Sequence, residues 1–231
     1  MPVQYQDFIY WQKQWLNQEN TTKYLDYWKQ KLEGAPTLLQ LPIDRPRPPI
    51  QTYRGGVESL VLPKSLAQQL KTLARQENVT PFMLLLAAFK ILLLHHTGQE
   101  DIVVGSPIAN RNHEKLKGLI GFFVNTIALR TNLAGNPSFR ELLSQIRQVA
   151  IEAYTHQDLP FEQLVEALQP ERNLSYTPIF QVMFAVRDTP KLPEINGLNL
   201  TQYQIDKETA QFDLNMSIEE EKIYLEYNKD L

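Results

Sequence analysis

The chain contains 231 residues, with 23 basic and 26 acidic side chains, a formal net charge of −3 and no cysteine. Without cysteine it has no disulfide framework, no thiolate nucleophile and no cysteine-based zinc site. The slight acidic excess, without clusters of Lys and Arg, excludes the positive surface on which most nucleic-acid binders depend.

Hydrophobic residues make up 43% of the chain and charged residues 21%, values typical of a folded globular protein. The first residues lack the basic and apolar regions of a secretory signal. The most apolar segment, residues 82–94, is too short to cross a bilayer and contains Lys90. We therefore expect a soluble, cytoplasmic protein that contacts neither membrane nor nucleic acid.

The N-terminal part is expected to be helical to about residue 34, with Asn20 as a helix cap and Gly34 at the C-terminal end. The proline-rich residues 42–49 predict an extended connector, because proline fixes φ and removes backbone donors. The predicted helical face consists of apolar residues at helical spacing: Tyr24, Leu25, Trp28 and Leu32.

The middle of the chain predicts a strand near residues 57–62 and a helix over residues 65–77. A second helix begins at Thr80 and Pro81 and stops near Gly98. Its apolar residues lie nearly all around the helix, which is typical of a helix buried inside a layered domain.

The second half predicts strands over residues 102–108 and 122–129, separated by a polar loop. Ser138 and Glu141 form a capping-box pair that opens a helix to about residue 154, and a short helix follows Pro160. Further strands are expected over these ranges: 179–186, 198–205, 212–218 and 223–227, the last two forming a hairpin. This order predicts an α/β layered domain with a mixed sheet flanked by helices.

Three segments are candidates for chemistry. His95 and His96, near Glu100 and Asp101, suggest a general base, but their place in the last helical turn favours a structural role at the helix dipole. Adjacent positions on a helix also diverge by about 100°, which disfavours a shared metal ion.

In the second segment, residues 120–130, Asn125 and Thr126 interrupt an apolar strand. A buried Asn125 either holds the backbone or faces a cavity, and the residues alone favour neither. In the third segment, Asp158 is expected to cap the helix after Pro160, whereas His156 as a proton carrier lacks a neighbouring nucleophile. Residues 172–178 are expected to form a turn rich in hydrogen-bonding side chains. The phosphate-loop, dinucleotide, serine-hydrolase and zinc-protease motifs do not occur.

Four segments resemble, in family order, motifs of the condensation domains of nonribosomal peptide synthetases. They are YQDFIYWQKQW (residues 5–15), IGFFVNTIALR (120–130), HQDLPFE (156–162) and ERNLSYTPIFQVMF (171–184), and GQEDIVVGSPIANR (98–111) is also similar to the family. Asn173 and Tyr176 depart from the family pattern. His95 and His96 do not match the family's catalytic HHxxxDG motif, because Glu100 and Asp101 stand where Asp and Gly belong.

The resemblance implies the C-terminal lobe of a two-lobed fold like that of chloramphenicol acetyltransferase. Residues 1–50 would be a helical and proline-rich lead-in, and residues 51–231 the α/β lobe. In the family, HHxxxDG lies upstream of the first matched motif, so the resemblance implies a missing N-terminal lobe that carries the catalytic histidine. No catalytic residue and no metal ligand are then expected in this chain.

The implied function is to form a tunnel wall and a carrier-docking surface for peptide-bond formation, with substrates on the phosphopantetheine of partner carrier proteins and no cofactor bound by this chain. The implied partners are the N-terminal lobe, peptidyl or acyl carrier proteins, an adenylation domain and, through an exposed lobe interface, a second copy. Phe122, Asn125 and Thr126 are the tunnel candidates. The motif residues expected to support the fold are Tyr5, Asp7, Trp11, Gly121, Arg130, His156, Gln157, Asp158, Pro160, Phe161, Glu162, Arg172, Ser175 and Pro178.

Two alternatives stay open. The first is a non-catalytic condensation-like module that recruits a carrier protein or a tailoring enzyme. The second is a stand-alone acyltransferase that uses His95 or His156.

Overall fold

The computed structural model describes residues 3–171, 173–187, 195–201, 203 and 208–231. The helices are α1 (Tyr5–Trp15), α2 (Gln18–Leu32), α3 (Lys64–Gln76), α4 (Pro81–Thr97), α5 (Phe139–Thr155) and α6 (Phe161–Leu168), with a short 3₁₀ helix at Glu114–Leu116. The strands are β1 (Gly55–Val61), β2 (Asp101–Ile108), β3 (Asn125–Asn132), β4 (Val182–Arg187), β5 (Leu214–Glu219) and β6 (Lys222–Asn228).

The described strands form one six-stranded sheet in the order β1-β6-β5-β4-β2-β3. β4 pairs in parallel with β5 and β2, whereas the pairs β1–β6, β5–β6 and β2–β3 are antiparallel. The expected mixed sheet and the terminal hairpin, now β5 and β6, are both confirmed.

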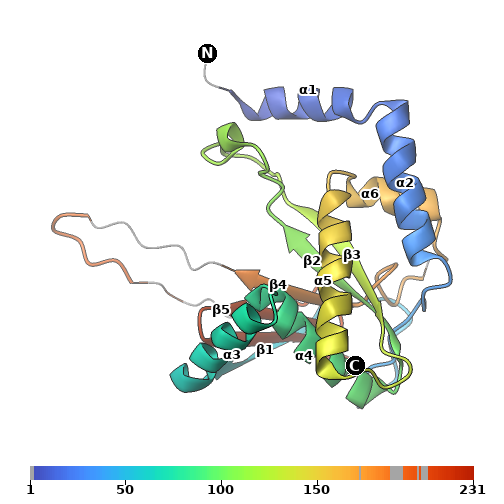
Figure 1. Cartoon of the computed structure of the whole chain (residues 1–231), viewed down its shortest axis with the longest axis vertical. Coiled ribbons are helices and arrows are strands. Elements are labelled where there is room, and N and C mark those ends of the chain that lie inside the picture. The colour runs from blue at the N-terminus through green and yellow to red at the C-terminus, as the bar shows by residue number, and fades with distance from the viewer. Residues whose placement is uncertain (1–2, 172, 188–194, 202, 204–207) are drawn as a thin grey trace.

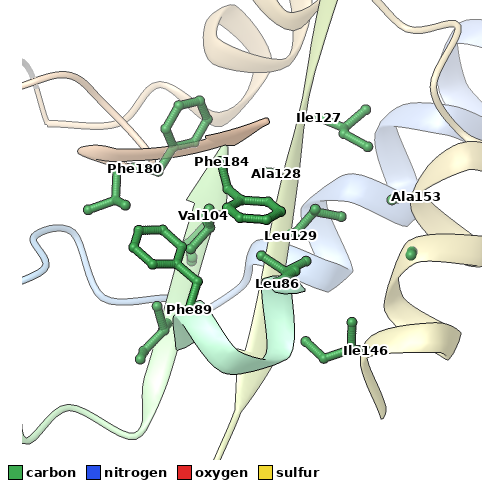
Figure 2. Close-up of a cluster of buried hydrophobic side chains, with 14 of the residues drawn as sticks. Leu86, Phe89, Val104, Ile127, Ala128, Leu129, Ile146, Ala153, Phe180 and Phe184 are labelled. Carbon is green, nitrogen blue, oxygen red and sulfur yellow. The ribbon is translucent and has the colours of Figure 1, made fainter. Parts of the chain in front are cut away.

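The main core lies between the sheet and the helices α4 and α5, which pack on each other and on the strands (Figure 1). Thr80 caps α4 by accepting from the backbone N–H of Met83, and Gly98 ends it with a φ of 68°. Side chains from both helices and three strands meet in this core, as Figure 2 shows. They include Leu86, Phe89, Val104, Ile127, Leu129, Ile146 and Phe184.

A second, small hydrophobic cluster attaches α1 to the rest of the chain. Phe8 packs there on Leu116 and Phe123, both from the connection between β2 and β3. Figure 1 places α1 away from the sheet, beside this connection. α2 instead joins the main core through Trp28 and Leu32.

Three predicted boundaries were wrong. The N-terminal helix is two helices, and Asn17 rather than Asn20 caps the second, because the Asn17 side chain accepts from the N–H of Asn20 at 2.9 Å. The strand expected over residues 122–129 begins at Asn125, since the neighbouring β2 ends at Ile108, which pairs with Asn125.

The strand expected over residues 179–186 begins at Val182, because Ile179 has a positive φ of 71° that interrupts an extended chain. Of the strand expected over residues 198–205, the described residues show only an isolated bridge between Ile195 and Leu198, and residues 202 and 204–207 lie outside the described part.

Among the described residues, no single helix has the length and apolar character needed to cross a membrane. The helices α3 and α4 taken together reach that length, but they are bent by 106° at their junction.

Candidate functional site

Asn125 joins two of the motif segments. Its side-chain amide donates to the carbonyl oxygens of Gln157 and Leu159, each at 2.8 Å, and its Oδ1 accepts from the N–H of Phe161 at 3.0 Å. The side chain is buried. Of the two roles left open by the sequence, the structure therefore supports backbone attachment: Asn125 fixes residues 157–161 against the start of β3.

The expectation that Asp158 caps the helix after Pro160 was wrong. The helix α6 begins at Phe161, and Pro160 occupies its cap position. The first backbone N–H of this helix, that of Phe161, donates to the side chain of Asn125 on β3. Asp158 accepts instead from the side chain of Asn112 at 3.2 Å. Burial raises the pKa of the Asp158 carboxyl, an effect that the Asn112 hydrogen bond opposes.

His156 has a structural role. Its ring stacks on Tyr27 with centroids 3.7 Å apart, and its Nδ1 lies 2.8 Å from the carbonyl oxygen of Glu152. The backbone carbonyl of His156 accepts from the indole N–H of Trp28 at 3.0 Å. The residue therefore fastens α2 to the end of α5. Burial raises the pKa of Tyr27, whose hydroxyl has no hydrogen-bond partner among the described residues.

Residues 119–124 form the segment that leads into β3, and its alternate side chains differ in exposure. Gly121 and Phe123 face α1, whereas Ile120, Phe122 and Val124 are 97%, 75% and 51% exposed. We call Ile120, Phe122 and Val124 the apolar row. Three exposed apolar side chains at alternate positions are typical of a surface that another apolar surface covers.

The helix α1 is fitted closely to this segment. A Cβ on Gly121 would overlap Cδ2 of Tyr5, and the Tyr5 hydroxyl donates to the carbonyl of Phe122 at 2.8 Å. Arg111 stabilises the same connection from inside: its guanidinium lies 4.0 Å from the ring centroid of Phe123 and donates to the carbonyl of Leu119 at 2.9 Å.

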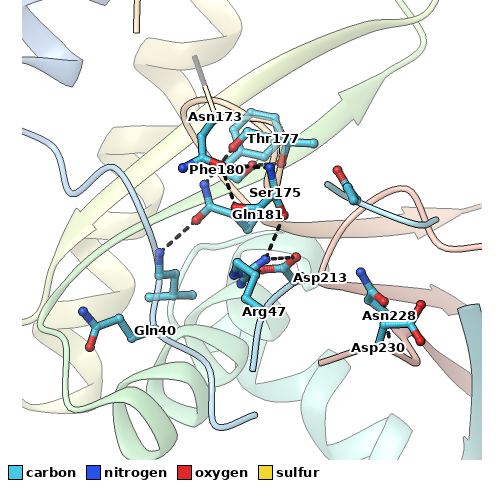
Figure 3. A network of polar contacts seen from close by, with 12 residues as sticks. Gln40, Arg47, Asn173, Ser175, Thr177, Phe180, Gln181, Asp213, Asn228 and Asp230 are labelled. Atoms are coloured by element: carbon cyan, nitrogen blue, oxygen red, sulfur yellow. Dashed lines mark hydrogen bonds and ion pairs between the residues drawn. The ribbon is translucent and has the colours of Figure 1, made fainter. Parts of the chain in front are cut away.

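A polar network surrounds the 173–178 turn, as expected from its composition (Figure 3). Gln181, which follows the turn, donates to the carbonyls of Thr37 and Thr177 and accepts from the N–H of Leu39 at 2.8 Å. Ser175 donates to Asn173 within the turn at 2.6 Å. This network joins the start of β4 to the segment that leads into the proline-rich connector.

Arg47 is the second link in this network, and sequence reasoning missed it. From the connector it reaches the carbonyl of Ser175 at 3.2 Å and both carboxylate oxygens of Asp213, at 2.9 and 2.5 Å. Arg47 and Asp213 are separated by 166 residues in the sequence, so no local pattern points to their pairing.

The other motif residues make structural contacts. Asp7 accepts from the N–H of Gln4 at the start of α1, and Arg130 pairs with Asp101 at 2.7 Å. Pro178 lies in the turn before β4, and Arg172 lies outside the described residues. The remaining candidate residues are also half-buried or exposed: Trp11, Gln157, Glu162, Ser175 and Thr126.

Sequence reasoning did not single out Lys90 as a structural residue. It is fully buried in α4 and donates to the carbonyls of Ile102 and Leu129 and to the hydroxyl of Thr131, at 3.1, 2.6 and 2.8 Å. Burial lowers its pKa well below the ordinary value, although the charge of Asp101 opposes this. Lys90 thereby attaches α4 to β2 and β3.

The histidine pair lies where the sequence predicted, in the last turn of α4, and both side chains are exposed. Within the described part of the chain, no group of three or more metal-ligating side chains is assembled. Among the described residues, the feature that stands out is a surface, namely the apolar row and its rigid support.

Comparison with known proteins gives a consistent result. A family model described as "Condensation domain" matches residues 1–231. The chain is 48% identical, over its whole length, to a linear gramicidin synthase from Brevibacillus parabrevis, and 40% identical to phosphinothricin tripeptide synthetase PhsC of Streptomyces viridochromogenes. It spans only 5% and 22% of the length of these two relatives.

Solved structures show the same likeness. The X-domain from teicoplanin biosynthesis matches with a TM-score of 0.89 at 26% identity, covering 99% of this chain and 55% of that chain. The four-domain nonribosomal peptide synthetase AB3403 matches with a TM-score of 0.85 at 26% identity, covering 92% of this chain and 18% of that chain.

Proposed function

The chain belongs to the condensation-domain family, and we propose from this premise that it is the C-terminal lobe of a peptide-bond-forming condensation domain. The single observation that carries the proposal is the whole-chain match, at 48% identity, to a stretch of the linear gramicidin synthase. The match to about half of the X-domain structure supports a two-lobed whole of which this chain is one part.

The proposed reaction joins two carrier-bound substrates. The amine of the acceptor attacks the thioester carbonyl of the donor, a C–N bond forms, the C–S bond breaks, and the donor carrier's phosphopantetheine thiol takes up a proton. The histidine that promotes the attack would come from the other lobe. This chain would position the two arms, and holding reactants in place contributes up to about 7–11 kcal/mol in favourable cases.

The apolar row is the surface best suited to this role. Phe122 is exposed and lies next to a rigid attachment, because Asn125 is held by three hydrogen bonds and the carbonyl of Phe122 by Tyr5. Phe122 is therefore the tunnel candidate that we retain. Asn125 acts as a positioning residue behind it. Thr126, the next residue, is half-buried, and we assign it neither of these two roles.

Carrier proteins, an adenylation domain and the N-terminal lobe are the proposed partners. The first experiment mixes this chain with the N-terminal lobe that precedes the matching stretch of the linear gramicidin synthase, and measures association by sedimentation velocity. A 1:1 complex that Phe122→Ser weakens supports the proposal. Two lobes that stay separate at all concentrations, each of them folded, would overturn it.

A second candidate function is a non-catalytic binding module. The observation that favours it is the likeness to the X-domain, which has been solved in complex with OxyB. A lobe of this kind would pair with its N-terminal lobe and bind a tailoring enzyme, yet form no peptide bond. The higher identity to the linear gramicidin synthase favours the catalytic function, and a condensation assay separates the two.

A further inference from the structure

A groove of about 480 Å³ lies between α1 and the loop that follows β2. We propose that this groove receives a basic side chain, carried on an apolar segment of the partner lobe. The inference rests on the proposed two-lobed function and goes beyond it, because it names a docking site and the chemistry of the segment that fills it.

The floor of the groove is aromatic. Trp11 and Trp15 stack with ring centroids 6.2 Å apart, and Phe8 lies 6.1 Å from Trp11. Trp11 is half exposed, although burial of a large apolar ring is favourable. Such aromatic faces bind aliphatic chains and cations.

The rim carries an excess of negative charge. Asp7 and Asp158 both line the groove, and Lys115 is the one lysine among its lining residues. His113, also on the rim, accepts from the backbone N–H of Lys115 through its Nδ1. Asp158 has a neutral donor, Asn112, as its hydrogen-bond partner. Burial raises the pKa of this carboxyl, so its charged form lacks full compensation until a cation approaches.

The partner lobe is the occupant that fits these features. The loop that lines the groove at residues 110–116 continues along the chain into the apolar row at residues 120–124, so both features belong to the same connection between β2 and β3. A partner lobe that packs on this connection can contact both the row and the groove. An ammonium or guanidinium over the tryptophan rings and beside Asp158 satisfies both the aromatic floor and the acidic rim.

The test uses the same association assay with paired variants. Asp158→Asn and Trp11→Ala remove the charge and the floor, whereas Asp26→Asn on α2 and Tyr10→Ala on the adjacent α1 position are matched controls outside the groove. We expect both groove variants to weaken the complex about tenfold or more. The controls should change the dissociation constant by less than about twofold. Asp158→Asn should also reduce the dependence of association on salt concentration.

Circular dichroism and urea unfolding of each variant establish that the fold is intact. A complex that forms with wild-type affinity when Asp158 and Trp11 are replaced overturns the groove assignment and leaves the two-lobed function standing. Failure of the wild-type lobes to associate overturns both. Weakening by Trp11→Ala alone, with unchanged salt dependence in Asp158→Asn, overturns the basic side chain as occupant.

Discussion

The side-chain amide of Asn125 donates to the backbone carbonyl of Leu159 at 2.8 Å, across 34 residues of sequence. Together with its bonds to Gln157 and Phe161, this contact makes one rigid unit of the first residue of β3 and the α5–α6 junction. Two motifs that lie apart in the sequence are therefore held together. The same contacts limit the movement of the apolar row, which immediately precedes Asn125.

Replacing Asn125 by alanine should destabilise the chain without changing its exposed surface, because the Asn125 side chain is buried. The variant loses three hydrogen bonds and leaves buried backbone groups without partners, which we expect to lower the free energy of unfolding by about 2–4 kcal/mol. Urea unfolding measures this value. The control is Thr126→Ala, because the Thr126 hydroxyl has no hydrogen-bond partner among the described residues. Equal stability of the two variants would contradict the assigned role.

Gly121 and Gly118 provide a matched pair. A Cβ at Gly121 would overlap the Tyr5 ring, whereas one at Gly118 meets nothing within 4 Å. Gly121→Ala should therefore displace α1 and cost about 1–3 kcal/mol, and Gly118→Ala should be nearly neutral. Hydrogen exchange over residues 5–15 should increase in the Gly121 variant alone. Unchanged protection of α1 would show that its packing on Gly121 is loose.

Lys90 predicts a pH dependence of stability. Its pKa is lowered in the folded chain, so between the folded and the unfolded pKa the unfolded chain binds more protons. Stability from this group must then rise with pH, by about 1.4 kcal/mol for each unit by which the pKa is lowered. Lys90→Met removes the titration. The wild-type chain should gain stability relative to Lys90→Met as pH increases toward about 10. A difference that stays constant with pH would mean that Lys90 is not perturbed.

Arg47 and Arg45 allow a test of the connector. Arg47→Met leaves the Asp213 carboxylate, 1% exposed, without its cation, and we expect a loss of about 3–5 kcal/mol of stability. Arg45→Met removes only a 3.5 Å contact to the carbonyl of Lys229 and should cost less than about 0.5 kcal/mol. Thermal unfolding of both variants measures the contrast. Similar melting temperatures would show that the buried pair does not stabilise the fold.

Until a partner covers it, the apolar row should cause self-association at high concentration. Phe122→Ser should reduce this association, whereas Leu174→Ser, at a side chain that is 71% exposed elsewhere, should not. Sedimentation at several protein concentrations measures the effect. A wild-type chain that stays monomeric up to millimolar concentration would contradict this expectation.

Local signals in the sequence predicted the elements well. The cap at Thr80, the end of the helix near Gly98 and the capping box of Ser138 with Glu141 depend on residues within a few positions, and all three are confirmed. Period-two alternation likewise predicted the β5–β6 hairpin. Such features follow from backbone chemistry that neighbouring residues determine.

Long-range partners were not predictable in this way. The start of β3 depends on where β2 ends, and the cap of α6 comes from Asn125 rather than from the nearby Asp158. The burial of Lys90 depends on carbonyls 12 and 39 residues away. The motif resemblance indicated which segments matter, but only the folded chain shows that they contact each other.

The most direct measurement of the central claim is a single-turnover condensation assay followed by intact-protein mass spectrometry. Donor and acceptor carriers loaded with aminoacyl thioesters are mixed with this chain, with the N-terminal lobe, or with both, and a complete condensation domain serves as the positive control. We predict dipeptide on the acceptor carrier only when both lobes are present. Dipeptide formed by this chain alone would contradict the account and return His95 and His156 to consideration, and none from an intact complex of the two lobes would favour the non-catalytic module.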